Sequence, residues 1–109
     1  MDNDAALDSL AALSQKTRLD AFRLLVRHEP EGLPAGAIAQ ELDVPANTLS
    51  THLAVLARAG LVTSERYSRV VQYRSDIGRL RDLMLYLAKD CCGGRTELCE
   101  PLVAELTCC

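Results

Sequence analysis

The stretch ELDVPANTLSTHLAVLARAGLVTSER, residues 41–66, decides the fold that this sequence predicts. Residues 46–59 predict a helix that Gly60 closes, because glycine is favoured just beyond a helix end. Its inward positions at helical spacing are Leu49, Leu53 and Leu56. Residues 34–42, PAGAIAQEL, predict a shorter helix before it, and the tight turn DVPA joins the two. A helix, a short turn and a second helix with a polar first half predict a helix-turn-helix.

Beyond the second helix, the apolar residues alternate with polar ones instead of following a helical period. The segments LVTSERY (61–67) and VVQYRS (70–75), joined by Ser68 and Arg69, therefore predict a β-hairpin. A basic hairpin that directly follows a helix-turn-helix predicts the wing of a winged helix-turn-helix.

Further helices are predicted on both sides of this centre. Residues 4–13 and 15–28 precede it, and Ser14 is the expected N-cap of the second of these helices. Residues 76–89 follow the hairpin, and a short helical turn is predicted from Pro101 through Leu106. The expected fold class is thus α+β, mainly α: a winged helix-turn-helix with about five helices and a β-hairpin wing.

The helix predicted at 76–89 carries more apolar surface than so small a domain can cover. Its apolar stripe consists of Leu80, Leu83, Met84 and Leu87. A chain of 109 residues buries a modest core and often gains stability from a second subunit. We therefore expect a homodimer that forms through the terminal helices.

Composition is that of an ordinary globular protein, with 49% hydrophobic and 25% charged residues. We expect one winged helix-turn-helix DNA-binding and dimerisation domain over residues 1–90 and a cysteine-rich sensor tail over residues 91–109. No apolar run approaches the roughly 20 residues that span a bilayer. The acidic start MDNDAALD lacks the basic region of a secretory signal. These features predict a cytoplasmic protein without a membrane partner.

The charge distribution matters more than the total. The whole chain has a net charge of −3, yet residues 44–75 hold four arginines and one glutamate. That segment therefore carries +3, and the rest of the chain carries −6. A local basic surface is what contact with nucleic-acid phosphates requires.

Two motifs in the opening stretch resemble those of the ArsR/SmtB family of metal-responsive bacterial repressors. They are Ser50-Thr51-His52-Leu53 in the second helix and the run from Val55 to Val62 that leads into the hairpin. The likeness covers about residues 5–88. It implies a repressor that binds double-stranded operator DNA as a homodimer.

The predicted DNA-binding residues lie at the start of the second helix and on the hairpin. Short polar side chains at the helix start suit close approach in the major groove, and arginines on the wing suit phosphates. These residues are Asn47, Thr48, Ser50, Thr51, His52, Arg66, Arg69 and Arg74. His52 has an alternative interpretation as a capping or packing residue within the domain.

The chain departs from the family at both of its familiar ion sites. The usual thiolate box reads E-L-C-V-C, whereas residues 41–45 here read ELDVP and contain no thiol. The other common site uses Asp and His residues of the last helix to hold zinc. The helix at 76–89 has Asp76 and Asp82 but no histidine. Neither site can be transferred to this chain.

All five cysteines fall in the last 19 residues, at Cys91, Cys92, Cys99, Cys108 and Cys109. Thiols clustered in a reducing compartment are more often ligands or redox groups than structural disulfides. Three thiolates make a neutral, closed site for a trivalent metalloid such as As(III). Adjacent cysteines suit its narrow angles, so Cys91 and Cys92 are the first two predicted ligands. The chain can reverse at Gly93-Gly94 and return Cys99 as the third.

The sequence leaves the ion open, because zinc would take a fourth ligand that Cys108 or Cys109 could supply. We expect a repressor of an arsenic-resistance operon, released when As(III), or Sb(III), binds Cys91, Cys92 and Cys99. As(III) then acts as inducer, and no organic cofactor is expected. The alternative is a repressor that senses thiol oxidation or another soft metal such as Cd, Pb or Zn.

A thiol reductase or a metal carrier that uses the adjacent cysteines is a further alternative. The tail has no neighbouring base, and its only cations are Lys89 and Arg95. A catalytic thiol pair usually lies at an electropositive helix start, whereas Cys91 and Cys92 follow a helix end. We therefore expect no enzymatic activity.

Overall fold

The computed structural model describes residues 1–88 together with Pro101 and Glu105. Its helices and strands are α1 (Asn3–Leu13), α2 (Lys16–Arg27), β1 (Leu33–Pro34), α3 (Ala35–Leu42), α4 (Ala46–Arg58), β2 (Val62–Tyr67), β3 (Val70–Ser75) and α5 (Ile77–Ala88). Five helices and a small antiparallel sheet confirm the predicted winged helix-turn-helix. All five cysteines, and most of the short helix predicted from Pro101, lie outside the described residues.

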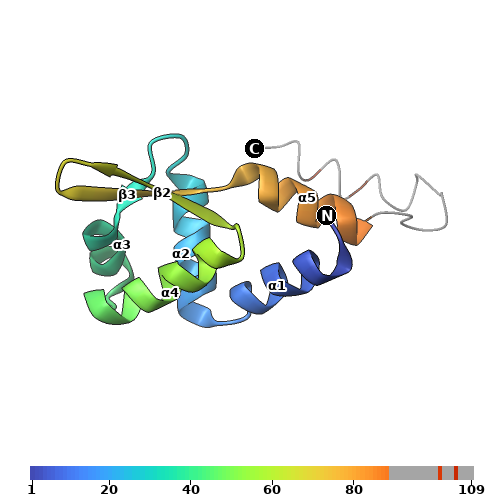
Figure 1. Ribbon diagram of the computed structural model, residues 1–109, viewed down its shortest axis with the longest axis horizontal. Coiled ribbons are helices and arrows are strands. Elements are labelled where there is room, and N and C mark those ends of the chain that lie inside the picture. The colour runs from blue at the N-terminus through green and yellow to red at the C-terminus, as the bar shows by residue number, and fades with distance from the viewer. Residues whose placement is uncertain (89–100, 102–104, 106–109) are drawn as a thin grey trace.

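Figure 1 shows how these elements divide along the long axis of the molecule. The tip of the β2–β3 hairpin and the start of α4 lie at one end. Helices α1 and α5 lie side by side at the other, where the Tyr86 hydroxyl donates to Oδ1 of Asn3 at 3.0 Å. Helix α2 lies between the two ends, and α3 lies at the same end as the start of α4.

The core lies among α2, α3, α4 and the start of β2. The fully buried large side chains are Leu25, Ile38, Leu49, Leu53, Leu56 and Leu61. The three inward leucines predicted for α4 are therefore confirmed. Burying each such side chain stabilises the fold by about 1.5–3 kcal/mol relative to its exposed state. The three buried leucines of α4 therefore fix how the helix is rotated and which of its residues are exposed.

The junction between α1 and α2 differs from the prediction by one residue. Ser14 ends α1 instead of opening α2, and its hydroxyl donates to the carbonyl of Ala11 at 3.0 Å. Gln15 is the N-cap of α2, and its Oε1 accepts from the backbone N–H of Arg18 at 2.9 Å. The prediction of Ser14 as the cap was wrong because its side chain bonds backward.

Helix α1 packs on the domain through its small residues. Ala6, Ser9 and Ala12 are buried, and the Ser9 hydroxyl donates to the carbonyl of Ala5, so no polar group is stranded. Small side chains allow α1 to lie close to its neighbours. The leucines at 7 and 10 stay exposed, at 55% and 40%.

The end of α4 is a tight reversal built around Gly60. The N–H of Gly60 donates to the carbonyl of Ala57 and that of Leu61 to Leu56, both at 3.0 Å. These two bonds form a Schellman motif, which needs a left-handed residue, and Gly60 has φ of 80°. Arg79 of α5 packs over this glycine, and its Nε donates to the carbonyl of Ala59 at 3.1 Å. The last helix is thereby bonded to the end of α4.

The sheet has the strand order β1-β3-β2, and all pairs are antiparallel. The hairpin and its Ser68-Arg69 turn match the prediction. Strand β1 was not predicted, because two residues before a helix carry no alternation. It pairs Leu33 with Tyr73, and Gly32 before it has φ of 75° and no room for a Cβ beside the Tyr73 carbonyl.

Candidate nucleic-acid interface

The start of α4 exposes the polar residues that the sequence predicts for DNA contact. Asn47, Thr48, Ser50 and Thr51 are all exposed, whereas His52 is half-buried. Pro45 precedes the helix and makes no side-chain cap. The first turn of α4 therefore presents backbone N–H groups together with short polar side chains.

Two of the three hydroxyls on this surface, those of Ser50 and Thr51, are bonded to their own helix. Ser50 Oγ donates to the carbonyl of Ala46 at 3.0 Å, and Thr51 Oγ1 donates to that of Asn47 at 3.4 Å. A hydroxyl that donates to the backbone keeps its oxygen lone pairs free. In this geometry both residues are acceptors, which suits the amino groups of adenine and cytosine in the major groove.

Helical spacing adds two residues to this surface that the sequence analysis missed. Asn47, Thr51, Ala54 and Arg58 are all exposed and lie at intervals of three and four, so they share one stripe of α4. A methyl group such as that of Ala54 suits contact with the methyl of thymine, and Arg58 suits a phosphate or guanine. The signal was present in the periodicity counted from Asn47. We refer to these four residues as the α4 stripe.

His52 lies beside the α4 stripe, not within it. It follows Thr51 and is therefore turned by about 100° toward the domain. Its Nδ1 lies 3.3 Å from Nη1 of Arg18, a residue of α2. Of the two alternative roles, capping and packing within the domain, the second fits this position. His52 is nevertheless only partly buried.

The hairpin arginines do not form a single row. Arg66 pairs across the strands with Val71, and Arg74 pairs with Thr63. Because residues alternate between the two faces of a strand, Arg66 and Arg74 lie on opposite faces of the hairpin. Arg69 occupies the turn and is exposed.

Arg74 is already bound to a carboxylate. Its Nη2 lies 2.8 Å from Oε2 of Glu29, whose other oxygen accepts from the Ser75 hydroxyl at 3.0 Å. The hydrogen bond from Arg74 lowers the pKa of Glu29 below its ordinary value, and the same bond raises the pKa of Arg74. Among the described residues, no carboxylate forms an ion pair with Arg66 or Arg69. These two arginines are therefore the freer candidates for phosphate contact.

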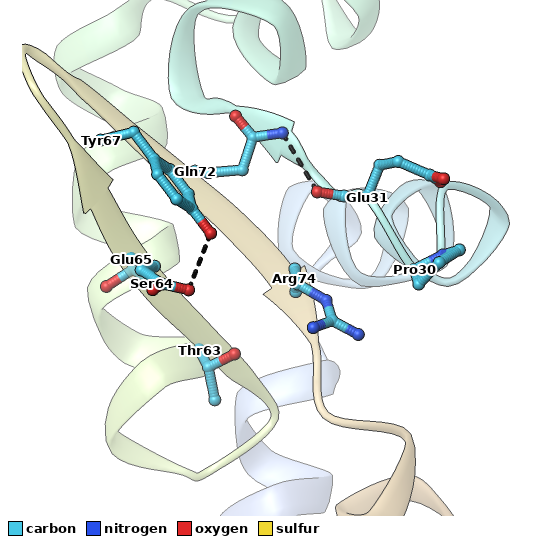
Figure 2. A pocket seen from close by; sticks show the side chains of 8 residues that line it. All are labelled: Pro30, Glu31, Thr63, Ser64, Glu65, Tyr67, Gln72 and Arg74. Carbon is cyan, nitrogen blue, oxygen red and sulfur yellow. Dashed lines mark hydrogen bonds between the residues drawn. The ribbon is translucent and has the colours of Figure 1, made fainter.

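A polar cleft of about 360 Å³ lies between the hairpin and the turn after α2 (Figure 2). Its lining residues are Pro30, Glu31, Thr63, Ser64, Glu65, Tyr67, Gln72 and Arg74. Tyr67 donates to Glu65 at 2.9 Å, which raises the pKa of the tyrosine, and Gln72 donates to the Glu31 carbonyl at 3.1 Å. Two of the polar side chains thus bond within the cleft, and the Gln72 bond braces the hairpin on the domain.

Helices α1 and α5 leave an apolar surface uncovered within the subunit. Of the stripe predicted for α5, only Leu83 is buried, and Leu87 is 59% exposed. A hollow of about 300 Å³ on α5 is lined by Ile77, Leu80, Arg81, Met84 and Leu85. We refer to the four apolar residues of this hollow, together with the exposed Leu7 and Leu10 of the neighbouring α1, as the α1–α5 apolar patch. It is the surface that a dimer through the terminal helices would bury.

The part of the chain that the structure describes holds no group of three or more His, Cys, Asp or Glu side chains arranged for a metal ion. The predicted ligands Cys91, Cys92 and Cys99, and the additional candidates Cys108 and Cys109, fall outside it. Their role stays a prediction. Within residues 1–88, none of the helices is long and apolar enough to cross a membrane.

An exposed polar stripe on the second helix of a helix-turn-helix, flanked by a basic hairpin, defines a winged helix-turn-helix DNA-binding domain. Residues 13–65 match the family described as a helix-turn-helix domain. No curated protein sequence matches the chain. The match and the fold are those of DNA-binding transcription regulators, not of enzymes.

Solved structures place the fold among ArsR-like regulators. An ArsR-like transcriptional regulator from Rhodococcus sp. RHA1 is 24% identical, with a TM-score of 0.70 over 94% of this chain and 92% of that one. The homodimeric winged helix-turn-helix DNA-binding domain Mb0332 of Mycobacterium bovis is 28% identical, with a TM-score of 0.64 over 80% and 81%. The transcriptional repressor BigR of Xylella fastidiosa is 26% identical, with a TM-score of 0.61 over 76% and 84%.

Proposed function

We propose that the protein is a homodimeric ArsR-family repressor that binds operator DNA through α4 and leaves it when As(III) or Sb(III) binds to its C-terminal thiols. The observation that carries the DNA-binding part is the exposed α4 stripe, on a helix that starts at the same end of the molecule as the hairpin tip. The homodimeric state of one similar structure and the repressor activity of another support the homodimeric and repressor parts of the assignment.

The arrangement of the two surfaces suits a palindromic operator. The α1–α5 apolar patch and the start of α4 lie at opposite ends of the long axis (Figure 1). Two copies joined through the patch would therefore carry their α4 helices at the outer ends of the dimer. Helix-turn-helix dimers place such helices in major grooves about one turn of DNA apart. Arg66 and Arg69 would contact the flanking phosphates.

Cys91, Cys92 and Cys99 are the proposed ligands of the inducer. The first two follow the end of α5 at Ala88 by only a few residues, and the usual thiolate box of the family is empty of cysteine here. Thiolates are the ligands that soft ions prefer, and binding would release their protons. A ligand held this close to α5 can act on the dimer.

The structure contains a direct connection from α5 to α4 that could carry this effect. Arg79 donates to the Ala59 carbonyl at the end of α4, and the N–H of Asp76 donates to the Leu61 carbonyl at 2.8 Å. The inducer needs only to stabilise the DNA-free dimer more than the bound one. A coupling of about 3 kcal/mol would weaken operator binding by more than a hundredfold.

The test begins with a DNA duplex that the wild-type protein selects from a random-sequence pool. Binding of the reduced dimer to this duplex is followed by fluorescence anisotropy while arsenite, antimonite, Cd(II), Pb(II) or Zn(II) is added. Arsenite and antimonite should release the DNA at the lowest concentrations. Failure to enrich any duplex would contradict the DNA-binding function, and release by Zn(II) or Cd(II) alone would contradict the arsenic assignment.

A thiol-oxidation sensor is the second candidate, favoured by the close spacing of the five cysteines, because clustered thiols oxidise readily. It shares the DNA-binding body and differs only in the signal. Diamide or peroxide would then release the duplex, dithiothreitol would restore binding, and arsenite would have no effect while reductant is present.

A further inference from the structure

Arg18 connects three helices through one guanidinium group. It belongs to the first turn of α2, and its Nε donates at 2.6 Å to the carbonyl of Ala12 in the last turn of α1. Its Nη1 lies 3.3 Å from Nδ1 of His52 in α4. Arg18 is half-buried, so both contacts are partly shielded from water, where hydrogen bonds to a charged group are stronger.

The contact with Arg18 determines which nitrogen of His52 carries the proton. A guanidinium group has five donors and no acceptor, so Nδ1 of His52 must accept. The neutral ring then carries its proton on Nε2. Among the described residues, no hydrogen bond engages that Nε2–H. His52 therefore offers one free donor whose identity Arg18 fixes.

The position of His52 indicates what this donor can reach. His52 lies at the margin of the α4 stripe and is half-buried, whereas Asn47 and Thr51 belong to the stripe and are exposed. When the centre of a recognition helix faces the base edges, side chains at its margin face the walls of the groove, where the phosphates run. Phosphate oxygens accept from neutral N–H donors as well as from cations, and such contacts set the orientation of the protein on DNA.

We propose that Arg18 is a positioning residue for DNA binding: it holds His52 as the neutral Nε2–H tautomer and directs that N–H to a backbone phosphate. The proposal rests on the DNA-binding function proposed above. Arg18 contacts no DNA and acts through His52. Its bond to Ala12 keeps the guanidinium in place, so the position of α1 also bears on the His52 donor.

The tautomer is tested on the full-length reduced protein without DNA, by long-range proton–nitrogen NMR correlation at mildly alkaline pH. The chain has two histidines, and His28→Gln assigns their signals. The His52 ring should show a protonated Nε2 and an unprotonated Nδ1, whereas the exposed His28 should average between tautomers. Arg18→Gln should make His52 average as well. A wild-type His52 ring that averages, or that is protonated on Nδ1, would overturn the proposal.

Binding is tested on the selected duplex with Arg18→Gln, His52→Ala and the double variant. Losing one hydrogen bond of this kind should weaken binding by about tenfold. Because Arg18 acts through His52, the double variant should bind no more weakly than His52→Ala alone. Arg23→Gln is the matched control, since it removes an exposed arginine from the same helix and should leave affinity unchanged.

The remaining outcomes discriminate between roles. If the two substitutions add, Arg18 does not act through His52 and the proposal fails. If Arg18→Gln also lowers the salt dependence of binding by about one phosphate contact, Arg18 touches DNA itself, which contradicts a positioning role. Failure of the wild-type protein to bind any duplex would refute the DNA-binding function, while the tautomer measurement would still decide how Arg18 holds His52.

Discussion

Gly60 shows how much a single position can require of the sequence. Its φ of 80° lies in the left-handed region, and a Cβ there would come within 3.1 Å of the Arg79 guanidinium. The glycine could be predicted because it follows the last inward leucine of α4. The Arg79 contact could not, because it joins residues 20 positions apart through a bond to a backbone carbonyl.

We predict that Gly60→Ala destabilises the protein by about 1–2 kcal/mol, the cost of a left-handed conformation for a residue with a Cβ. It should also shift Arg79 from the end of α4. Gly36→Ala is the control, because that glycine is exposed within α3 and a Cβ there meets nothing within 4 Å. The control should leave stability unchanged or raise it slightly. Urea unfolding followed by circular dichroism measures both, and equal stability of the two variants would contradict the account.

At the scale of elements, the helical period and the strand alternation predicted where α1, α4, α5 and the hairpin lie, but not always which apolar residues their own domain buries. Helix α4 buries the three leucines that were predicted to face inward. Helix α1 instead buries alanine and serine and exposes Leu7 and Leu10, and the hairpin exposes Tyr67 and Val70. A large apolar side chain indicates a surface that is buried, but the sequence does not say whether the same subunit or a partner buries that surface. Strand β1 was missed because two residues have no period.

The hairpin is also tied to the body of the domain by a contact that no local pattern predicts. Arg74 was expected on a phosphate, but Glu29 lies 45 positions away and binds it. The lowered pKa of Glu29 means that its ionised form stabilises the fold. That contribution is complete above the ordinary pKa range of glutamate and is lost as pH falls through the lower folded-state pKa.

We predict that Glu29→Gln lowers the melting temperature slightly, by about 2 °C at neutral pH, because the pair is partly exposed to solvent. The difference from wild type should shrink as pH falls from the ordinary glutamate range through the lowered folded-state pKa of Glu29, where the wild-type carboxyl group becomes neutral like glutamine. The same substitution frees Arg74 and should steepen the salt dependence of DNA binding. A difference in melting temperature that grows toward low pH would contradict the assigned role of the ion pair.

At the scale of the whole molecule, the α1–α5 apolar patch is the feature that a single subunit leaves unexplained. Leu85 is 62% exposed and lies beside the hollow lined by Ile77 and Met84. Apolar surface of this kind is stabilised when a second copy covers it. The sequence predicted part of the patch, because Leu80 and Met84 line the hollow and Leu87 is exposed. Leu83 is buried within the subunit, and Ile77 and Leu85 were not predicted.

We predict that Leu85→Glu converts the protein to a monomer, because a charge buried without a partner costs about 3 kcal/mol or more, over a hundredfold in dimer affinity. The variant should keep its helical circular dichroism and lose operator binding. Val70→Glu is the control, a similar change on the exposed hairpin far from the patch, and it should stay dimeric. Sedimentation velocity gives the answer, and a Leu85→Glu dimer of wild-type affinity would place the interface elsewhere.

The proposed sensor is the part of the molecule for which sequence chemistry is the only guide. The cysteines could be recognised by their confinement to the last 19 residues. Their arrangement could not be predicted further, because thiolate ligands in a tail are brought together by the ion they bind and not by a core that pattern reveals.

The most direct test of the central claim is an arsenite titration of the reduced protein on its selected duplex, read by fluorescence anisotropy. It compares wild type with Cys91→Ser, Cys92→Ser and Cys99→Ser, and Cys108→Ser serves as the matched control in the same tail. We predict that arsenite releases the wild-type and Cys108→Ser proteins, and that each of the other three variants binds the duplex normally but stays on it. If all three variants were released at the wild-type arsenite concentration, Cys91, Cys92 and Cys99 would not form the sensor.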